Sequence, residues 1–161
     1  MLIDNFLNKT NRILFIGCGV ALMYVINITI ASLPFSENMS DVPEINEFKE
    51  NGLVAFFFIA VLIVPVYETL IFQYIPIKAT KFVLKNQKQQ LQILSAIILS
   101  SLLFSLSHWY NITYIITTFL GGIILAYSFI LSYKRKESPI LNVFIIHSIY
   151  NAIVFAIDVS N

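Results

Sequence analysis

Five long apolar runs constrain this chain more than any other feature, because each is about as long as a helix that crosses a membrane. Hydrophobic residues make up 58% of the 161 positions and charged residues 12%, a balance far from that of soluble globular domains. In lipid, a helix satisfies its own backbone hydrogen bonds. The sequence therefore predicts an all-α, polytopic transmembrane helix bundle of about five spans. These spans are expected at 13–33, about 52–77, 91 to about 109, about 112–133 and about 140–157.

Charged residues lie mainly between these runs and indicate an orientation. Basic residues cluster near the amino terminus, at 78–88 and at 134–136, whereas the segment 34–50 carries five acids and one lysine. Because basic loops stay in the cytosol, the amino terminus is predicted to be cytosolic, in what we expect to be a bacterial plasma membrane. The first run is too long for a cleaved signal and is interpreted as a retained span. Residues 1–161 are expected to form a single integral membrane domain.

The same charge distribution limits the partners. The net charge is +1 and the basic clusters are short, which disfavours a nucleic-acid partner. A single cysteine, Cys18, excludes an intramolecular disulfide framework and a multi-cysteine metal cluster. The expected partners are membrane lipid and a membrane-associated peptide or protein substrate.

Three ionisable side chains stand out because they fall within or at the end of the predicted spans: Glu68, His108 and His147. Such groups are costly in lipid and usually face a bundle interior or a cavity. Asn151 follows His147 by four residues and therefore shares its helical face, as Phe104 does with His108. Taken singly, each histidine is more often a packing residue, and an asparagine commonly joins helices. The serines at 95–107 lack a nucleophile-elbow motif and are interpreted as packing residues, and Gly121 and Gly122 as points of close helix approach.

The stretches YETLIFQ (67–73), FSLSH (104–108) and HSIYN (147–151) resemble the motifs of a known family. This is the CAAX protease and bacteriocin-processing (CPBP, or Abi) family of intramembrane endopeptidases. Its pattern is Glu-Glu-x-x-x-Arg, then Phe-x-x-x-His, then His-x-x-x-Asn or Asp, each on a separate helix. The resemblance extends over about 64–151, and a family-like core is expected at about 52–157.

The resemblance implies catalytic roles for Glu68, His108, His147 and Asn151. Glu68 would act as general base on a water that His108 helps to position, and the water would attack a peptide carbonyl. His147 and Asn151 would donate hydrogen bonds to the oxyanion. No cofactor is favoured, although zinc bound by Glu68, His108 and His147 is an alternative, since two histidines and one glutamate form a known catalytic set.

The chain departs from the family pattern at two positions, because Thr69 replaces the second glutamate and Gln73 replaces the arginine. A catalytically inactive scaffold or immunity-type protein of the same fold is therefore an alternative to the peptidase. A proton-coupled transporter is disfavoured by the small number of spans and by the lack of an internal repeat. The sequence does not specify the substrate.

Overall fold

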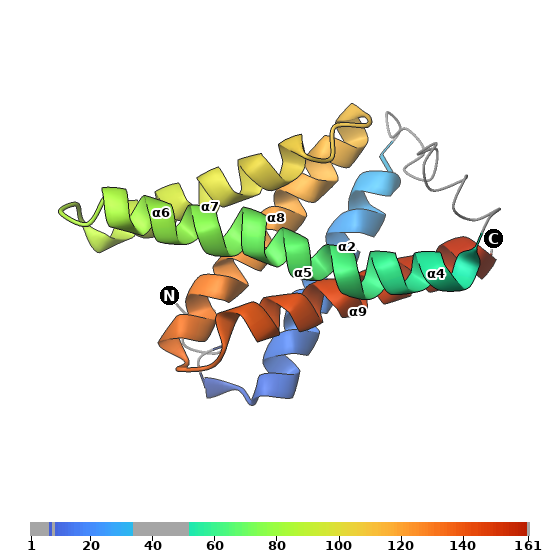
Figure 1. Cartoon of the computed structure of the whole chain (residues 1–161), viewed down its shortest axis with the longest axis horizontal. Coiled ribbons are helices and arrows are strands. Elements are labelled where there is room, and N and C mark those ends of the chain that lie inside the picture. The colour runs from blue at the N-terminus through green and yellow to red at the C-terminus, as the bar shows by residue number, and fades with distance from the viewer. Residues whose placement is uncertain (1–6, 8, 34–51, 161) are drawn as a thin grey trace.

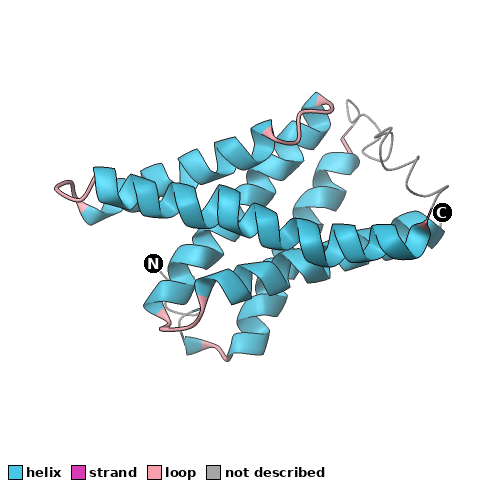
Figure 2. Cartoon of the chain, in the orientation of Figure 1, coloured by secondary structure: helices cyan, strands magenta, loops and turns pink. Residues whose placement is uncertain are grey.

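The computed structural model describes residues 7, 9–33 and 52–160, and this part of the chain is built from helices without strands (Figures 1 and 2). Five helical segments in it are long and apolar enough to cross a membrane, which confirms the predicted all-α class. The first, third, fourth and fifth spans are α2 (Arg12–Ala31), α7 (Gln89–Leu106), α8 (Ile112–Lys134) and α9 (Pro139–Ser160). The second span runs through α4 (Leu53–Phe58), the π-helix η1 (Ile59–Ile63), α5 (Val64–Glu68), the π-helix η2 (Thr69–Tyr74) and α6 (Ile75–Val83).

The second span is longer than the sequence suggested. It contains 31 residues and ends at Val83, so the prediction that a loop begins at Lys78 is wrong. No glycine or proline follows Pro76 before the helix ends, so nothing in the sequence stops it earlier. The lysines on this last stretch pack on an aromatic ring at the end of α8, with the Nζ atoms of Lys78 and Lys81 lying 4.9 and 5.7 Å from the Tyr133 ring centroid.

Because the second span is extended, Glu68 and His108 lie at similar distances from the turn that joins α6 and α7. At 1.5 Å per residue, Glu68 lies about 22 Å along the helix from Val83, and His108 lies about 28 Å from Gln89. Because α6 and α7 pack against each other and are joined by the short turn at 84–88, the two side chains reach nearly the same level. In Figure 1 this hairpin projects from the bundle at the left of the view.

Helix α8 lies at the centre of the bundle and contacts α7, α9 and α2. Its side chains Leu125, Ala126 and Phe129 are completely buried. Gly122 marks a close approach to α7, because a Cβ atom there would lie 3.0 Å from the Cα of Ser101. The prediction of close approach therefore applies to Gly122, whereas a Cβ at Gly121 would meet only a methionine methyl group at 3.6 Å.

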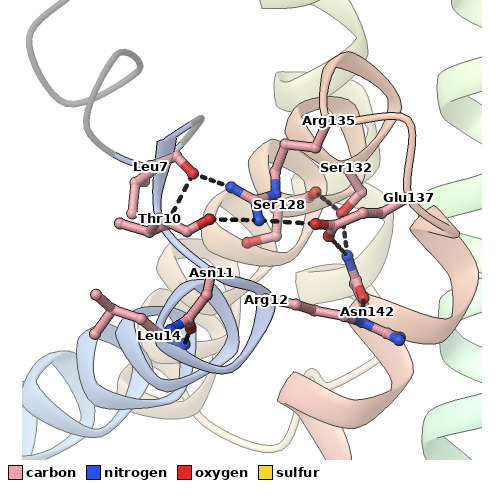
Figure 3. A network of polar contacts seen from close by, with 10 residues as sticks. All are labelled: Leu7, Thr10, Asn11, Arg12, Leu14, Ser128, Ser132, Arg135, Glu137 and Asn142. Carbon is pink, nitrogen blue, oxygen red and sulfur yellow. Dashed lines mark hydrogen bonds and ion pairs between the residues drawn. The ribbon is translucent and has the colours of Figure 1, made fainter.

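A polar network joins the start of α2 to the turn between α8 and α9 (Figure 3). Arg135 donates to the carboxylate of Glu137 at 2.7 Å and to the Thr10 carbonyl at 3.0 Å. The Asn142 amide donates to the other oxygen of Glu137 and accepts from Arg12, both at 2.7 Å. The hydrogen bond from Arg135 is the main reason why the pKa of Glu137 is lowered. The network holds α2 against the α8–α9 turn.

Candidate active site

Glu68 is the centre of the candidate site. Its Oε1 lies 3.1 Å from Nε2 of His108, and its Oε2 lies 3.5 Å from Nε2 of His147. Glu68 comes from the second span, His108 from the turn that follows α7, and His147 from α9. The packing of these helices brings the three side chains together. The Glu68 and His108 side chains are 13% and 16% exposed, which leaves a small opening for water. An acid placed between two imidazoles can exchange protons with either of them.

Phe104 orients His108. Nδ1 of His108 lies 2.7 Å from the Phe104 carbonyl oxygen, one helical turn earlier. Because a carbonyl only accepts, Nδ1 must carry a hydrogen, and the other nitrogen then faces Glu68. The Phe104 ring also packs on both imidazoles, with centroid distances of 4.6 Å to His108 and 5.8 Å to His147. The spacing of the Phe-x-x-x-His motif is therefore explained by one carbonyl and one ring.

Asn151 lies on the same helix as His147 but contacts a different group. Its Nδ2 donates to the Ala60 carbonyl at 2.9 Å, in the π-helix that precedes Glu68. An asparagine amide carries two hydrogens, so one remains for another acceptor. The structure thus brings Glu68, His108 and His147 into contact and shows Asn151 bonded to the backbone of the second span.

Two π-helical segments flank Glu68, and a proline follows each one. The N–H of Val64 bonds to the Ile59 carbonyl and the N–H of Ile75 bonds to the Leu70 carbonyl, each five residues back. The next residues are Pro65 and Pro76, which have no N–H to continue either ladder. Each proline therefore leaves carbonyls without their helical donor, and such groups need partners from elsewhere in the bundle.

Other helices supply those partners. Asn151 donates to the Ala60 carbonyl, which in π-helical register would have bonded to the missing N–H of Pro65. Ser100 donates to the Phe72 carbonyl, which in α-helical register would have bonded to the missing N–H of Pro76. The segment that carries Glu68 is thus attached at one end to α9 and at the other to α7.

Thr69 and Gln73 are fully buried, and their polar side-chain atoms have no hydrogen-bond partner among the described residues. Nδ1 of His147 is also buried without such a partner. Unpaired buried polar atoms are costly and are commonly satisfied by internal water. The two positions at which this chain departs from the family pattern therefore face the protein interior.

Zinc binding by Glu68, His108 and His147 stays a prediction. Among the described residues, no three His, Cys, Asp or Glu side chains form a group that could hold a metal ion. Instead, the two imidazoles contact different oxygens of Glu68.

A comparison with family models assigns residues 50–153 to the Rce1-like family, described as type II CAAX prenyl endopeptidase Rce1-like. The match covers more than half of the 161 residues and includes all three motifs. The chain belongs to this family. Comparisons with curated proteins and with solved structures gave no significant match. The family is one of membrane peptidases, and the first span, α2, precedes the matched segment.

Several residues around the site were missed by the motif analysis. Ser100, one of the serines expected only to pack, donates a hydrogen bond to the Phe72 carbonyl of another helix. Tyr114 lies with its ring centroid 5.7 Å from that of His108. Asn27 of α2 donates to the Tyr150 hydroxyl at 2.6 Å. For Ser100, the signal was a pair of prolines inside an apolar span, because each one demands a donor from a neighbouring helix.

Proposed function

We propose that the chain is an intramembrane endopeptidase of the CPBP type, in which water activated by Glu68 attacks a peptide bond of a membrane-associated substrate. The observation that supports this best is the contact of the Glu68 carboxylate with Nε2 of both His108 and His147. Family membership supports the coarser class of membrane peptidase. Catalysis by Glu68 and the absence of a metal requirement remain parts of the proposal.

The hydrogen bonds of His108 indicate where the proton between His108 and Glu68 is held. Its Nδ1 hydrogen is committed to the Phe104 carbonyl. A contact between Nε2 and an oxygen of Glu68 then needs one further proton, because two acceptors do not attract each other. That proton is shared between Glu68 and His108. When it lies on Nε2, Glu68 is an ionised base that can take a proton from water while the imidazolium orients that water.

Glu68 would keep the proton taken from water until the tetrahedral intermediate collapses. It would then transfer that proton to the leaving amine, so the base of the first step is the acid of the second. His147 faces the other oxygen of Glu68 and would donate a hydrogen bond to the developing oxyanion. The second Nδ2 hydrogen of Asn151 would be the other donor, while the first holds the Ala60 carbonyl.

The inactive scaffold remains the alternative because of Thr69 and Gln73. Two neutral side chains occupy fully buried positions where the family pattern has a charged pair. The catalytic set proposed above does not require either of them to touch the substrate. Activity measurements therefore decide between the two functions.

We propose a cytosolic amino terminus in a bacterial plasma membrane. The network between Arg135 and the segment before α2, together with the contacts of Lys78 and Lys81 with Tyr133, supports this orientation, because they gather the basic segments at one end of the bundle. The acidic segment 34–50 lies outside the described residues.

The test is cleavage by the purified protein in detergent against a library of membrane-associated peptides. Glu68→Gln keeps the shape of the side chain but cannot serve as a base, so we expect a loss of roughly 10²-fold to 10⁴-fold. Glu137→Gln is the matched control, because it makes the same chemical change in the network at the basic end. We expect it to retain activity. Melting curves of both variants would show that each is folded.

Three other results would contradict parts of the proposed function. Cleavage by Glu68→Gln at the parental rate would refute the assignment of the base. Loss of cleavage in a strong chelator, with recovery on addition of zinc, would favour the zinc-dependent version. A folded parent that cleaves nothing in the library would favour the scaffold.

A further inference from the structure

A groove separate from the candidate site lies between α7 and α8 at the basic end of the bundle. Its volume is about 410 Å³, within the range of about 300–1,000 Å³ that is common for small-molecule sites. Gln89 and Gln90, which line it, are the first residues of α7. His108 lies about 28 Å further along the same chain segment. The groove is thus far from Glu68 and its histidines.

The lining of the groove changes from polar to apolar with depth. Gln89, Gln90 and Lys134 lie at its mouth, where α7 begins and α8 ends. One and two turns deeper along the helices, the lining consists of the Tyr127 side chain and of aliphatic side chains, among them Ile93, Ile97 and Ile130. A ligand that fits this gradient has a polar head and a hydrocarbon chain.

The charge at the mouth selects an anionic head. Lys134 is exposed and has no ion-pair partner in the part of the chain that the structure describes. Lys78 and Lys81 pack on the neighbouring Tyr133 and add positive charge nearby. Glu137, the closest acid along the chain, is already paired with Arg135. The region therefore carries unbalanced positive charge at the level of lipid headgroups.

We propose that this groove binds one anionic phospholipid. The phosphate lies at the mouth, with Lys134 as its ionic partner and the amides of Gln89 and Gln90 as hydrogen-bond donors. One acyl chain extends along Ile93, Ile97 and Ile130. Leu94, which also lines the groove, is 57% exposed, so the groove is open to the surrounding lipid and can be filled from the bilayer. The bound lipid bridges the start of α7 and the end of α8.

The experiment measures lipid binding and needs no peptidase activity. The full chain in a neutral detergent is titrated with phosphatidylglycerol or with phosphatidylcholine of the same acyl chains, and bound lipid is counted by native mass spectrometry. We expect one phosphatidylglycerol per chain and weaker binding of phosphatidylcholine. Lys134→Gln should weaken the phosphatidylglycerol complex about fivefold, the scale expected for one lysine at an anionic surface. Lys9→Gln, at an exposed lysine of the same end that does not line the groove, is the control and should change binding less than twofold.

A second variant keeps the test valid if Lys134→Gln does not fold. Gln90→Glu preserves size and places a negative charge at the mouth, so it should weaken the binding of net-anionic phosphatidylglycerol more than that of zwitterionic phosphatidylcholine. Soluble glycerol phosphate tests whether the head alone suffices, and we expect no measurable binding. The proposal is refuted by equal affinity for the two lipids, by an equal effect of Lys9→Gln and Lys134→Gln, or by glycerol phosphate binding as tightly as the lipid.

Discussion

Ser100 and Pro76 should contribute to stability as a coupled pair. Pro76 removes the N–H that would bond to the Phe72 carbonyl in α-helical register, and Ser100 supplies a hydroxyl in its place. Ser100 is completely buried, so no lipid or bulk water can replace the hydroxyl. Ser100→Ala should therefore leave the carbonyl unpaired in the parent. In a Pro76→Ala background the segment can adopt α-helical register, in which the new N–H bonds to that carbonyl, and Ser100 should no longer be needed.

The free-energy cost of Ser100→Ala can be estimated from the hydrogen bond that is lost. An unpaired buried acceptor costs about 1–3 kcal/mol, whereas side-chain hydrogen bonds measured inside membrane proteins average about 0.6 kcal/mol, with a maximum of about 1.7 kcal/mol. Because the hydroxyl replaces a missing backbone donor, we expect a cost near the upper value, about 1–1.5 kcal/mol, for Ser100→Ala in the parent. The same change in the Pro76→Ala background should cost less than about 0.5 kcal/mol. The coupling energy is then about 1 kcal/mol.

The assay is equilibrium unfolding in mixed micelles, monitored by circular dichroism, for the parent, both single variants and the double variant. Ser101→Ala is the matched control. Ser101 is equally buried and lies next to Ser100, but its hydroxyl donates to the carbonyl of Ile97 in its own helix. Its removal should cost less, and that cost should not depend on residue 76. Equal costs of Ser100→Ala in both backgrounds would refute the proposed link between the serine and the proline.

Three further predictions concern other parts of the molecule. Gly122→Ala should destabilise the protein by roughly 1–3 kcal/mol in the same unfolding assay, because its Cβ would lie 3.0 Å from backbone, whereas Gly121→Ala, with 3.6 Å to a flexible methyl group, should cost less. The arginine beside Glu137 lowers the pKa of that carboxyl, so its stabilising effect is complete above pH 4.5 and declines as the pH falls through the lowered value. A pH series should therefore show a smaller loss of stability on acidification for Glu137→Gln than for the parent. Reporter fusions in the turn at 84–88 and after Ser160 should report the cytosol and the opposite side, respectively, and signals from the same side would contradict the orientation.

The sequence was sufficient to predict the spans and to select Glu68, His108 and His147. Apolar runs of membrane length can be satisfied only by helices. Ionisable groups within those runs are rare enough that three of them point to one interior. The contacts at 3.1 and 3.5 Å were not readable from the sequence, since they depend on how three helices pack.

The second span shows what the sequence pattern missed and why. Hydropathy placed its end near Ile77, because lysines begin at Lys78, yet the helix continues to Val83. Long lysine side chains can extend from a helix toward the interface, so a lysine does not by itself end a span. The π-helical segments have no composition signal of their own. They depend on Pro65 and Pro76 together with donors from other helices.

Asn151 is one of those donors, so it has a structural contact as well as a proposed catalytic role. The family pattern assigns it to catalysis, and its spacing from His147 places both on one helical face. In the structure its amide also donates to the Ala60 carbonyl, which Pro65 leaves without a helical donor, about two turns before Glu68. Loss of its amide would then free the backbone that carries the carboxylate and remove a proposed oxyanion donor at the same time. Replacement of Pro65 by alanine separates the two effects, because a restored N–H can take over the backbone role but cannot reach the substrate.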